Sequence, residues 1–292
     1  MEVAWHMTKG FPQEFPDGVL RELGTAYGIL DSSEPCLEAV LSKPDRIYVG
    51  DEFCPARMPD LHGLSRFIRF ADKKELPLTL LTPVLTDPGI EHLIPLFDRV
   101  SRWNPASEVV INDLGVLFFL KKRYPDFQLS MGRLFNKGFK DPRLDLNKSR
   151  VSEKINGFLN DCSFNRENIQ ILAEGLGIKR VEQDLLPYAD PASVGMSRLK
   201  TAVYLPFGYV TTGRVCFTAG LNPHTDNRFS LGAACSSPCA VHRMELKHPD
   251  LVFKLFQNGN TIFYLYTLTM IRFLLENARQ KGFRLIFQGG LI

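Results

Sequence analysis

Residues 108–123, EVVINDLGVLFFLKKR, contain the pattern that decides the fold. The run EVVIN is short, apolar and β-branched, which is typical of a buried strand. A polar Asn-Asp step ends it, and the residues from 114 to 123 form a helical pattern. The stretch therefore predicts a strand at 108–112 that passes into a helix at 114–123, which is one β/α unit.

The same rhythm extends in both directions along the chain. Strands are expected at 45–50, 78–85, 127–134, 181–186, 201–207, 251–256 and 283–287, and helices at 60–74, 88–103, 166–175 and 269–281. Alternating strands and helices imply a parallel sheet with helical crossovers. About eight strands predict an α/β fold of the (β/α) TIM-barrel-like kind, whether regular, irregular or incomplete. A doubly wound sheet is the alternative, and the absence of both GxGxxG and GxxxxGK[ST] disfavours it.

Two regions interrupt the rhythm. Residues 1–44 are punctuated by proline and glycine, with one helical pattern near 19–30, and residues 137–163 are polar and irregular. We therefore expect an N-terminal extension at 1–44, and a single barrel-like domain at 45–292 with an insertion near 137–163.

Composition is that of a globular protein of enzyme size. The 292 residues are 45% hydrophobic and 23% charged, with a net charge of +3. A net charge so nearly balanced does not indicate nucleic-acid binding, although such binding stays open because a local basic patch is compatible with this charge. The N-terminus has no signal-peptide pattern, and the apolar run at 261–275 contains Arg272, so we expect no membrane span and a cytoplasmic location.

Four of the six cysteines stand where they could act together. Residues 216–239, CFTAGLNPHTDNRFSLGAACSSPC, contain Cys216 after a strand-like run, and Cys235 and Cys239 in a turn rich in small residues. Cys54 follows the strand at 45–50. In a reducing compartment, clustered cysteines more often mark metal or redox chemistry than disulfides.

Soft thiolates select zinc, Cu(I) or an iron–sulfur centre. Two cysteines on separate strands plus one close pair suit a bulky cluster better than a zinc ribbon, which uses two compact pairs. The alternative is that these cysteines are small buried apolar residues. Cys36 and Cys162 fit that alternative better, and His224 and His242 fit ordinary loop histidines.

Further candidates follow from the barrel, because functional groups gather at the C-terminal ends of its strands. The substrate-binding candidates are Arg57, Asn112, Asp113, Arg133 and Asn136. Asp113 could be a general base, but an Asp in that position is often a helix N-cap. Arg57 could anchor an anionic substrate by bidentate pairing.

Several segments resemble the collagenase-like peptidase superfamily, in particular its UbiV-type branch. These are IYVGDEFCPAR (47–57), EVVINDLGVLFFL (108–120), GRVCFTAG (213–220), the Cys235/Cys239 pair and FQNGNTIFYLYTL (256–268). The His-Gly-Ala-Leu-Cys form of the peptidase members is absent, and Pro-Phe-Gly-Tyr stands at 206–209.

The resemblance implies a barrel-like fold and a [4Fe-4S] cluster bound by Cys54, Cys216, Cys235 and Cys239, with zinc as the alternative metal. It implies a small-molecule substrate and a heterodimer with a UbiU-type partner that supports oxygen-independent hydroxylation in ubiquinone biosynthesis. Other members hydroxylate RNA bases, and some are classed as peptidases. A collagenase-like hydrolase and a non-catalytic iron–sulfur partner subunit are therefore the alternative functions.

Overall fold

The computed structural model describes residues 1–7, 43–141, 152–187, 194–195, 197–221, 229–230, 235–242, 244–251 and 253–288. Eight parallel strands close into a barrel, which confirms the TIM-barrel-like fold. Around the barrel the strand order is β1, β12, β7, β6, β5, β4, β3, β2. No helix in these ranges is long and apolar enough to cross a membrane.

The barrel strands are short and almost entirely buried. They are β1 (Glu2–Met7), β2 (Arg46–Gly50), β3 (Leu78–Leu81), β4 (Glu108–Ile111), β5 (Gln128–Met131), β6 (Arg180–Gln183), β7 (Lys200–Leu205) and β12 (Arg284–Phe287). Strands of a parallel barrel are covered on both faces, so they read as nearly continuous apolar runs. This is why the sequence pattern located seven of them.

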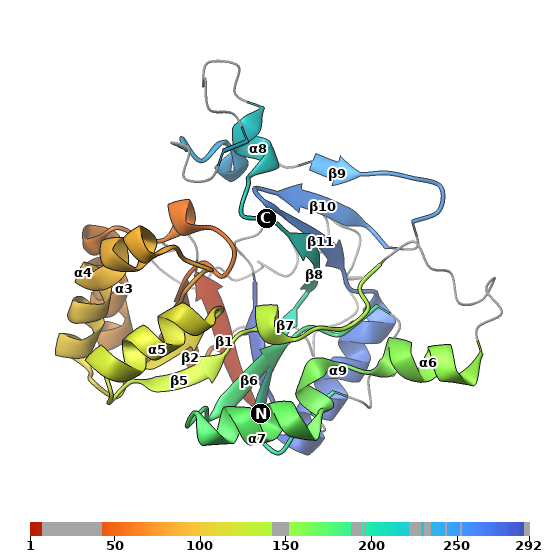
Figure 1. Cartoon of the computed structure of the whole chain (residues 1–292), viewed down its shortest axis with the longest axis horizontal. Coiled ribbons are helices and arrows are strands. Elements are labelled where there is room, and N and C mark those ends of the chain that lie inside the picture. Colours follow the sequence, from red (N-terminus) through yellow and green to blue (C-terminus); the bar gives the residue numbers. More distant parts are fainter. Residues whose placement is uncertain are drawn as a thin grey trace.

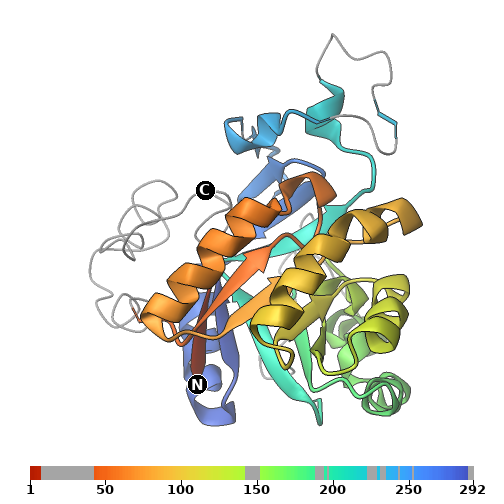
Figure 2. The same cartoon turned by 90° about the vertical axis from the view of Figure 1, so that its left-hand side faces the viewer.

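Helices cover the outside of the barrel. They are α3 (Leu61–Lys74), α4 (Asp87–Trp103), α5 (Leu114–Arg123), α7 (Glu167–Gly175) and α9 (Leu268–Lys281). A further helix, α6 (Glu153–Asn160), lies to one side of the barrel (Figure 1), and most of its described residues are exposed. In α3 the residues Leu64, Phe67, Ile68 and Ala71 are buried, a spacing that places them on one helix face. Figure 2 shows the orange helix α3 lying across the outer face of the first strands.

The eighth barrel strand is β1, which we had assigned to the N-terminal extension. It pairs in parallel with β12 on one side and β2 on the other. Ala4 joins the apolar cluster inside the barrel, whereas Val3, Trp5 and Met7 join the larger outer core. These six residues are far in sequence from the next strand, so they do not fit the strand–helix alternation of the rest of the chain. Their pairing in the closed barrel is what identifies them as a strand. The helix expected at 19–30 lies outside the described residues.

The strand expected at 251–256 does not belong to the barrel. The chain instead builds a second, antiparallel sheet in the order β8 (Phe207–Thr212), β11 (Thr261–Leu265), β10 (Leu255–Asn258), β9 (Met244–Leu246). A two-residue turn, Gly259 and Asn260, joins β10 to β11. This small sheet and the one-turn helix α8 (Phe217–Gly220) occupy the connection between β7 and α9.

The connection lies over the C-terminal ends of the barrel strands. In Figure 1 the N-terminus marks the lower end of the barrel, and β8, β10 and β11 stand above the opposite end with α8 beyond them. The small sheet thus carries the cysteine-rich stretch across the mouth of the barrel, the end at which TIM barrels hold their functional groups.

Candidate functional site

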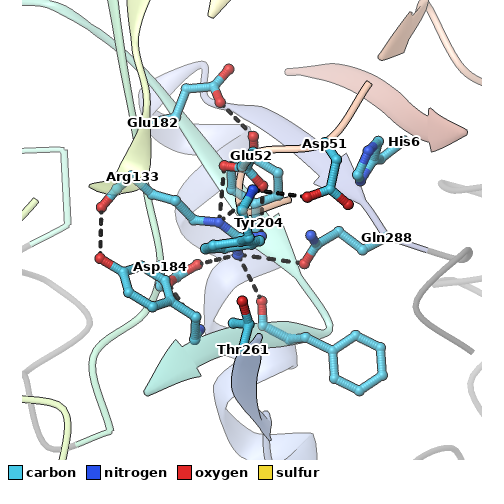
Figure 3. Close-up of polar contacts among 12 residues, drawn as sticks. His6, Asp51, Glu52, Arg133, Glu182, Asp184, Tyr204, Thr261 and Gln288 are labelled. Carbon is cyan, nitrogen blue, oxygen red and sulfur yellow. Dashed lines mark hydrogen bonds and ion pairs between the residues drawn. The ribbon is translucent and has the colours of Figure 1, made fainter. Parts of the chain in front are cut away.

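Arg133 stands at the centre of the barrel mouth. It follows β5, and its side chain is wholly buried. Its Nη2 donates to Glu52 Oε2 at 2.7 Å and its Nη1 donates to Asp184 Oδ1 at 2.7 Å. Figure 3 shows these carboxylates and the Gln288 amide converging on the guanidinium. Because Glu52, Asp184 and Gln288 follow β2, β6 and β12, Arg133 ties four strand ends together.

A second set of polar groups lies deeper in the barrel. Glu182 Oε1 accepts a hydrogen bond from Tyr48 at 2.8 Å, and its Oε2 accepts one from Tyr204 at 2.5 Å. The Tyr204 ring also lies 3.8 Å from the Arg133 guanidinium carbon, measured to the ring centroid. Burial, together with the neighbouring Glu52 charge, raises the pKa of Glu182 to about 8. Burial also raises the pKa of Glu52 to about 7, although Arg133 opposes this.

A third network closes the lower end of the barrel. Arg284 Nη1 lies 2.8 Å from Glu108 Oε2, and its Nε lies 2.7 Å from Glu2 Oε2. Arg46 pairs with Glu2 at 2.9 Å. All four residues begin strands. At the N-terminal face of such a barrel, charged networks of this kind serve stability.

Cys54 is positioned by a tight turn after β2. Asp51 Oδ1 accepts the backbone N–H groups of Phe53 and Cys54, both at 2.8 Å. Asp51 Oδ2 pairs with Arg57 Nε at 3.1 Å, and Arg57 Nη1 donates to Asn258 Oδ1 at 3.1 Å. The Cys54 turn is thereby joined to the β10–β11 turn.

The β10–β11 turn connects all three cysteine-bearing segments. Asn260 Nδ2 donates to the backbone carbonyls of Phe53 at 2.8 Å and Gly213 at 2.7 Å. Thr218 of α8 donates to Gly259 O at 3.1 Å. A Cβ atom at Gly259, whose φ is +64°, would lie 3.6 Å from Cys239 Sγ. The helix α8 also packs against the 3₁₀ turn Pro238–Ala240.

The cysteine thiols influence one another's pKa values. Burial, together with the charges of Asp51, Cys216 and Cys239, raises the pKa of Cys54 to about 12. Burial also raises the pKa of Cys239, where Cys216 and Cys235 act in the same direction. None of the five cysteines in the described ranges is in a disulfide. In those ranges no group of three or more His, Cys, Asp or Glu side chains is arranged to hold a metal ion.

Three of the four thiols also accept backbone N–H groups. Ala219 N lies 3.4 Å from Cys216 Sγ, and Ser237 N lies 3.3 Å from Cys235 Sγ. The N–H of Ala56 points at the Cys54 sulfur. Such donors stabilise a thiolate, and hydrogen bonds to sulfur are one of the means by which a protein tunes an iron–sulfur cluster.

The structure gives each substrate-binding candidate a definite environment. Asp113 is the N-cap of α5 and accepts from Val116 N at 2.8 Å and Leu85 N at 2.9 Å. Asn112 Nδ2 donates to the Thr82 carbonyl at 2.9 Å. These contacts hold adjacent loops at the strand ends. Asn136 is buried and borders a cavity beside the barrel mouth. Cys36 and His224 lie outside the described residues, and His242 is exposed.

The sequence interpretation missed Glu52, Glu182, Asp184, Tyr204, Lys140 and Gln288. One signal was available: the strand expected at 181–186 contains two carboxylates, Glu182 and Asp184. Acidic residues are seldom fully buried unless they are paired. Two of them in a buried strand therefore indicate partners inside the barrel, but the sequence does not identify those partners.

Comparison with known proteins adds little to this description. No protein-family model and no curated protein matches the chain. A search of solved structures finds the U32 peptidase Mk0906, of the collagenase-like family, at 14% identity and a TM-score of 0.37. The match covers 70% of this chain and 68% of that one. A likeness this weak carries no argument about function, and the UbiV-type branch stays a prediction.

Proposed function

We propose that the chain binds a [4Fe-4S] cluster through Cys54, Cys216, Cys235 and Cys239, and that it supports oxygen-independent hydroxylation. One observation carries the proposal. The β10–β11 turn is hydrogen-bonded to the segments that carry Cys54 and Cys216, and its Gly259 lies beside Cys239 Sγ, above the C-terminal ends of the barrel strands.

The donor set suits the cluster chemically. Four thiolates are the usual ligands of a [4Fe-4S] centre, and the backbone N–H groups beside three of the sulfurs would stabilise their negative charge. When bound, the cluster would supply one-electron transfer. The chain's own contribution is to hold the ligands: Asp51 fixes the Cys54 turn, and Asn260 joins that turn to the segment before Cys216.

The hydroxylation role rests on the resemblance to the UbiV-type branch. It places the chain in a heterodimer with a second family member that acts in quinone biosynthesis. The buried centre around Arg133 fits a supporting role in this activity. Its guanidinium is occupied by protein carboxylates, so it holds the strand ends that carry the site in a fixed arrangement.

Anaerobic purification tests the cluster directly. We expect a brown protein with about four iron and four sulfide per chain. Cys54→Ala and Cys239→Ala should each lower both counts. The matched control is Cys162→Ala, because Cys162 is a buried cysteine whose Sγ lies 3.8 Å from Gln183 Oε1. A colourless protein with one zinc would overturn the cluster, and full iron content in Cys54→Ala would remove Cys54 from the ligand set.

The biological role needs a separate test. Cells of the source organism that lack this chain, grown without oxygen, should lose ubiquinone and accumulate precursors with fewer hydroxyl groups. Unchanged quinone content in the deletion strain would refute the quinone role without affecting the cluster. Gelatin incubated with the purified chain should stay intact, and cleavage that survives further purification would favour the collagenase-like alternative.

A further inference from the structure

A cavity of about 660 Å³ opens beside the barrel mouth. One wall comes from the small sheet, through Tyr209 and Val210 of β8, Leu255 of β10 and Ile262 of β11. The opposite wall is the segment that follows β5, from Leu134 to Asp141. The volume is within the range of small-molecule sites, which are mostly apolar with a few placed polar groups.

The cavity and the space next to Cys54 lie on opposite faces of the small sheet. Along β11 the side chain of Ile262 borders the cavity, whereas its neighbours Thr261 and Phe263 border the small space next to Cys54. Successive residues of a strand point to opposite faces. The cavity is therefore a separate site, and its occupant does not compete with a group bound by the cysteines.

Lys140 supplies the cavity with a buried cation. Its Nζ lies 3.5 Å from Asp184 Oδ2 and 3.2 Å from the centroid of the Tyr209 ring. Burial lowers the pKa of Lys140 to about 8, although Asp184 opposes this. An ammonium has three N–H donors, and the described residues give this one a single, long contact to an oxygen. The arrangement leaves Lys140 with donor capacity for a ligand.

The charges around the cavity favour an anion. Its charged lining residues are Lys137, Lys140 and Asp141, two cations and one anion. The carboxylate of Asp184 is not part of the lining, and Arg133 holds it at 2.7 Å. An anionic group next to Lys140 would therefore meet a positive end of the cavity, and the rest of the ligand would lie against aliphatic side chains.

Asn136 gives a second indication that a partner is missing. The side chain is 1% exposed and borders the cavity, and its Oδ1 has no hydrogen-bond partner in the described part of the chain. Buried polar atoms without a partner are rare in folded proteins. A bound water or a hydroxyl group of a ligand would satisfy this oxygen.

We infer that this cavity binds a small monocarboxylate with an apolar body, whose carboxylate is held by Lys140 and whose body packs on Leu255 and Ile262. The site goes beyond the proposed iron–sulfur function and does not depend on it.

Three probes separate the parts of this proposal. 2-Naphthoate has both the carboxylate and an apolar body, 2-naphthalenemethanol has the same body with an uncharged hydroxyl in place of the carboxylate, and acetate has the charge alone. Titration calorimetry with the full chain should give 2-naphthoate a Kd of about millimolar or tighter, as expected for a ligand of about 13 non-hydrogen atoms. Both other probes should bind at least about tenfold more weakly, because each lacks one of the two contributions.

Two variants locate the binding. Lys140→Met keeps the aliphatic stem and removes the charge, so 2-naphthoate should lose about ten- to hundredfold in affinity while 2-naphthalenemethanol is unchanged. Ile262→Trp should place a bulky ring where the apolar body lies and weaken binding of both. The control is Ile171→Trp, at a position on α7 that is 57% exposed, and it should bind like the wild type.

The comparison of the three probes on the wild-type chain tests the inference even if a variant fails to fold. The inference is overturned if 2-naphthoate does not bind at millimolar concentrations, or binds no better than 2-naphthalenemethanol. Binding that survives both Lys140→Met and Ile262→Trp overturns it as well. Cys54→Ala should retain full affinity, so a failure of the iron–sulfur proposal and a failure of this one are distinguishable.

Discussion

Replacement of Arg133 by methionine is the sharpest perturbation of the barrel mouth. The guanidinium and its partners Glu52 and Asp184 are all fully inaccessible to solvent, and both ion pairs are 2.7 Å long. Removing one member of a buried ion pair costs about 3–5 kcal/mol, since the remaining charge is left without compensation. Lys140 stays near Asp184 at 3.5 Å, and Glu52 can take up a proton. We therefore expect a loss near the lower limit, about 3 kcal/mol at pH 7.

Calorimetry and urea unfolding measure this loss. At about 2.1 cal/mol/K per residue, the 292 residues give an unfolding entropy of roughly 0.6 kcal/mol/K, so about 3 kcal/mol lowers the Tm by about 5 °C. The matched control is Arg166→Met. Arg166 pairs with Asp161 at 3.0 Å on the surface, where its side chain is 54% exposed, and such pairs contribute under about 1 kcal/mol.

The pH dependence and a second substitution test the cause. The pKa of Glu52 is already raised to about 7 in the wild type, and loss of Arg133, which lowers it, raises it further. A carboxyl with a raised folded-state pKa loses its contribution to stability as pH rises toward that pKa. The wild type stops losing this contribution near pH 7, whereas Arg133→Met continues to lose it, so the deficit of Arg133→Met should be nearly constant below about pH 7 and grow above it. Adding Glu52→Gln should restore about 1–2 kcal/mol. The reasoning fails if Arg133→Met costs no more than Arg166→Met, or if Glu52→Gln lowers the stability of Arg133→Met as much as that of the wild type.

Three further predictions concern single positions. Glu182 has a pKa raised to about 8 in the folded protein, against about 4.5 when unfolded, so its contribution to stability declines as pH rises between these values. In urea unfolding, Glu182→Gln should therefore gain stability relative to the wild type from pH 5 to pH 9. A difference that stays constant with pH would contradict this prediction. Gly50 has φ +113°, and an added Cβ would collide with the Leu81 carbonyl oxygen, so Gly50→Ala should lower the free energy of unfolding by about 3 kcal/mol or more. Gly157 on α6 has open space around it, so the control Gly157→Ala should raise the free energy of unfolding by up to about 1 kcal/mol. Equal Tm values for the two variants would refute the argument. Asp113→Ala should cost about 1–2 kcal/mol through loss of the α5 cap with iron content unchanged, and loss of iron at full stability would indicate a role in the site.

The predictions from the sequence agree with the structure where they depend on residues close together in the chain, and they fail where they depend on contacts between distant residues. The element at 114–123 was predicted because its signals lie within one β/α unit, and the structure gives the same bounds. The count of eight strands was correct although its membership was not: the segment at 251–256 was counted in the barrel and Glu2–Met7 was left out. Both are short apolar runs, and only their pairing partners distinguish a barrel strand from a strand of the antiparallel sheet.

The polar centre shows the limit of the sequence most clearly. Arg133 was selected because it stands at the end of the strand predicted at 127–134, and it does lie at the barrel mouth, two residues after β5. Its partners Glu52 and Asp184 are 81 and 51 residues away along the chain. No local pattern connects them, so the ion network could not be derived from the sequence, and neither could the occupation of the guanidinium by protein carboxylates.

The sequence by itself determined the alternation of strands and helices and the barrel that follows from it, and it supplied the cysteines as candidate ligands, because periodicity and residue chemistry are local properties. Tertiary structure alone decided that Glu2–Met7 closes the barrel and that a small sheet covers its mouth. It also placed Cys54 beside one face of that sheet and Lys140 in a cavity on the other. These features depend on which strands pair and which side chains share a buried space, and contacts between distant segments set both.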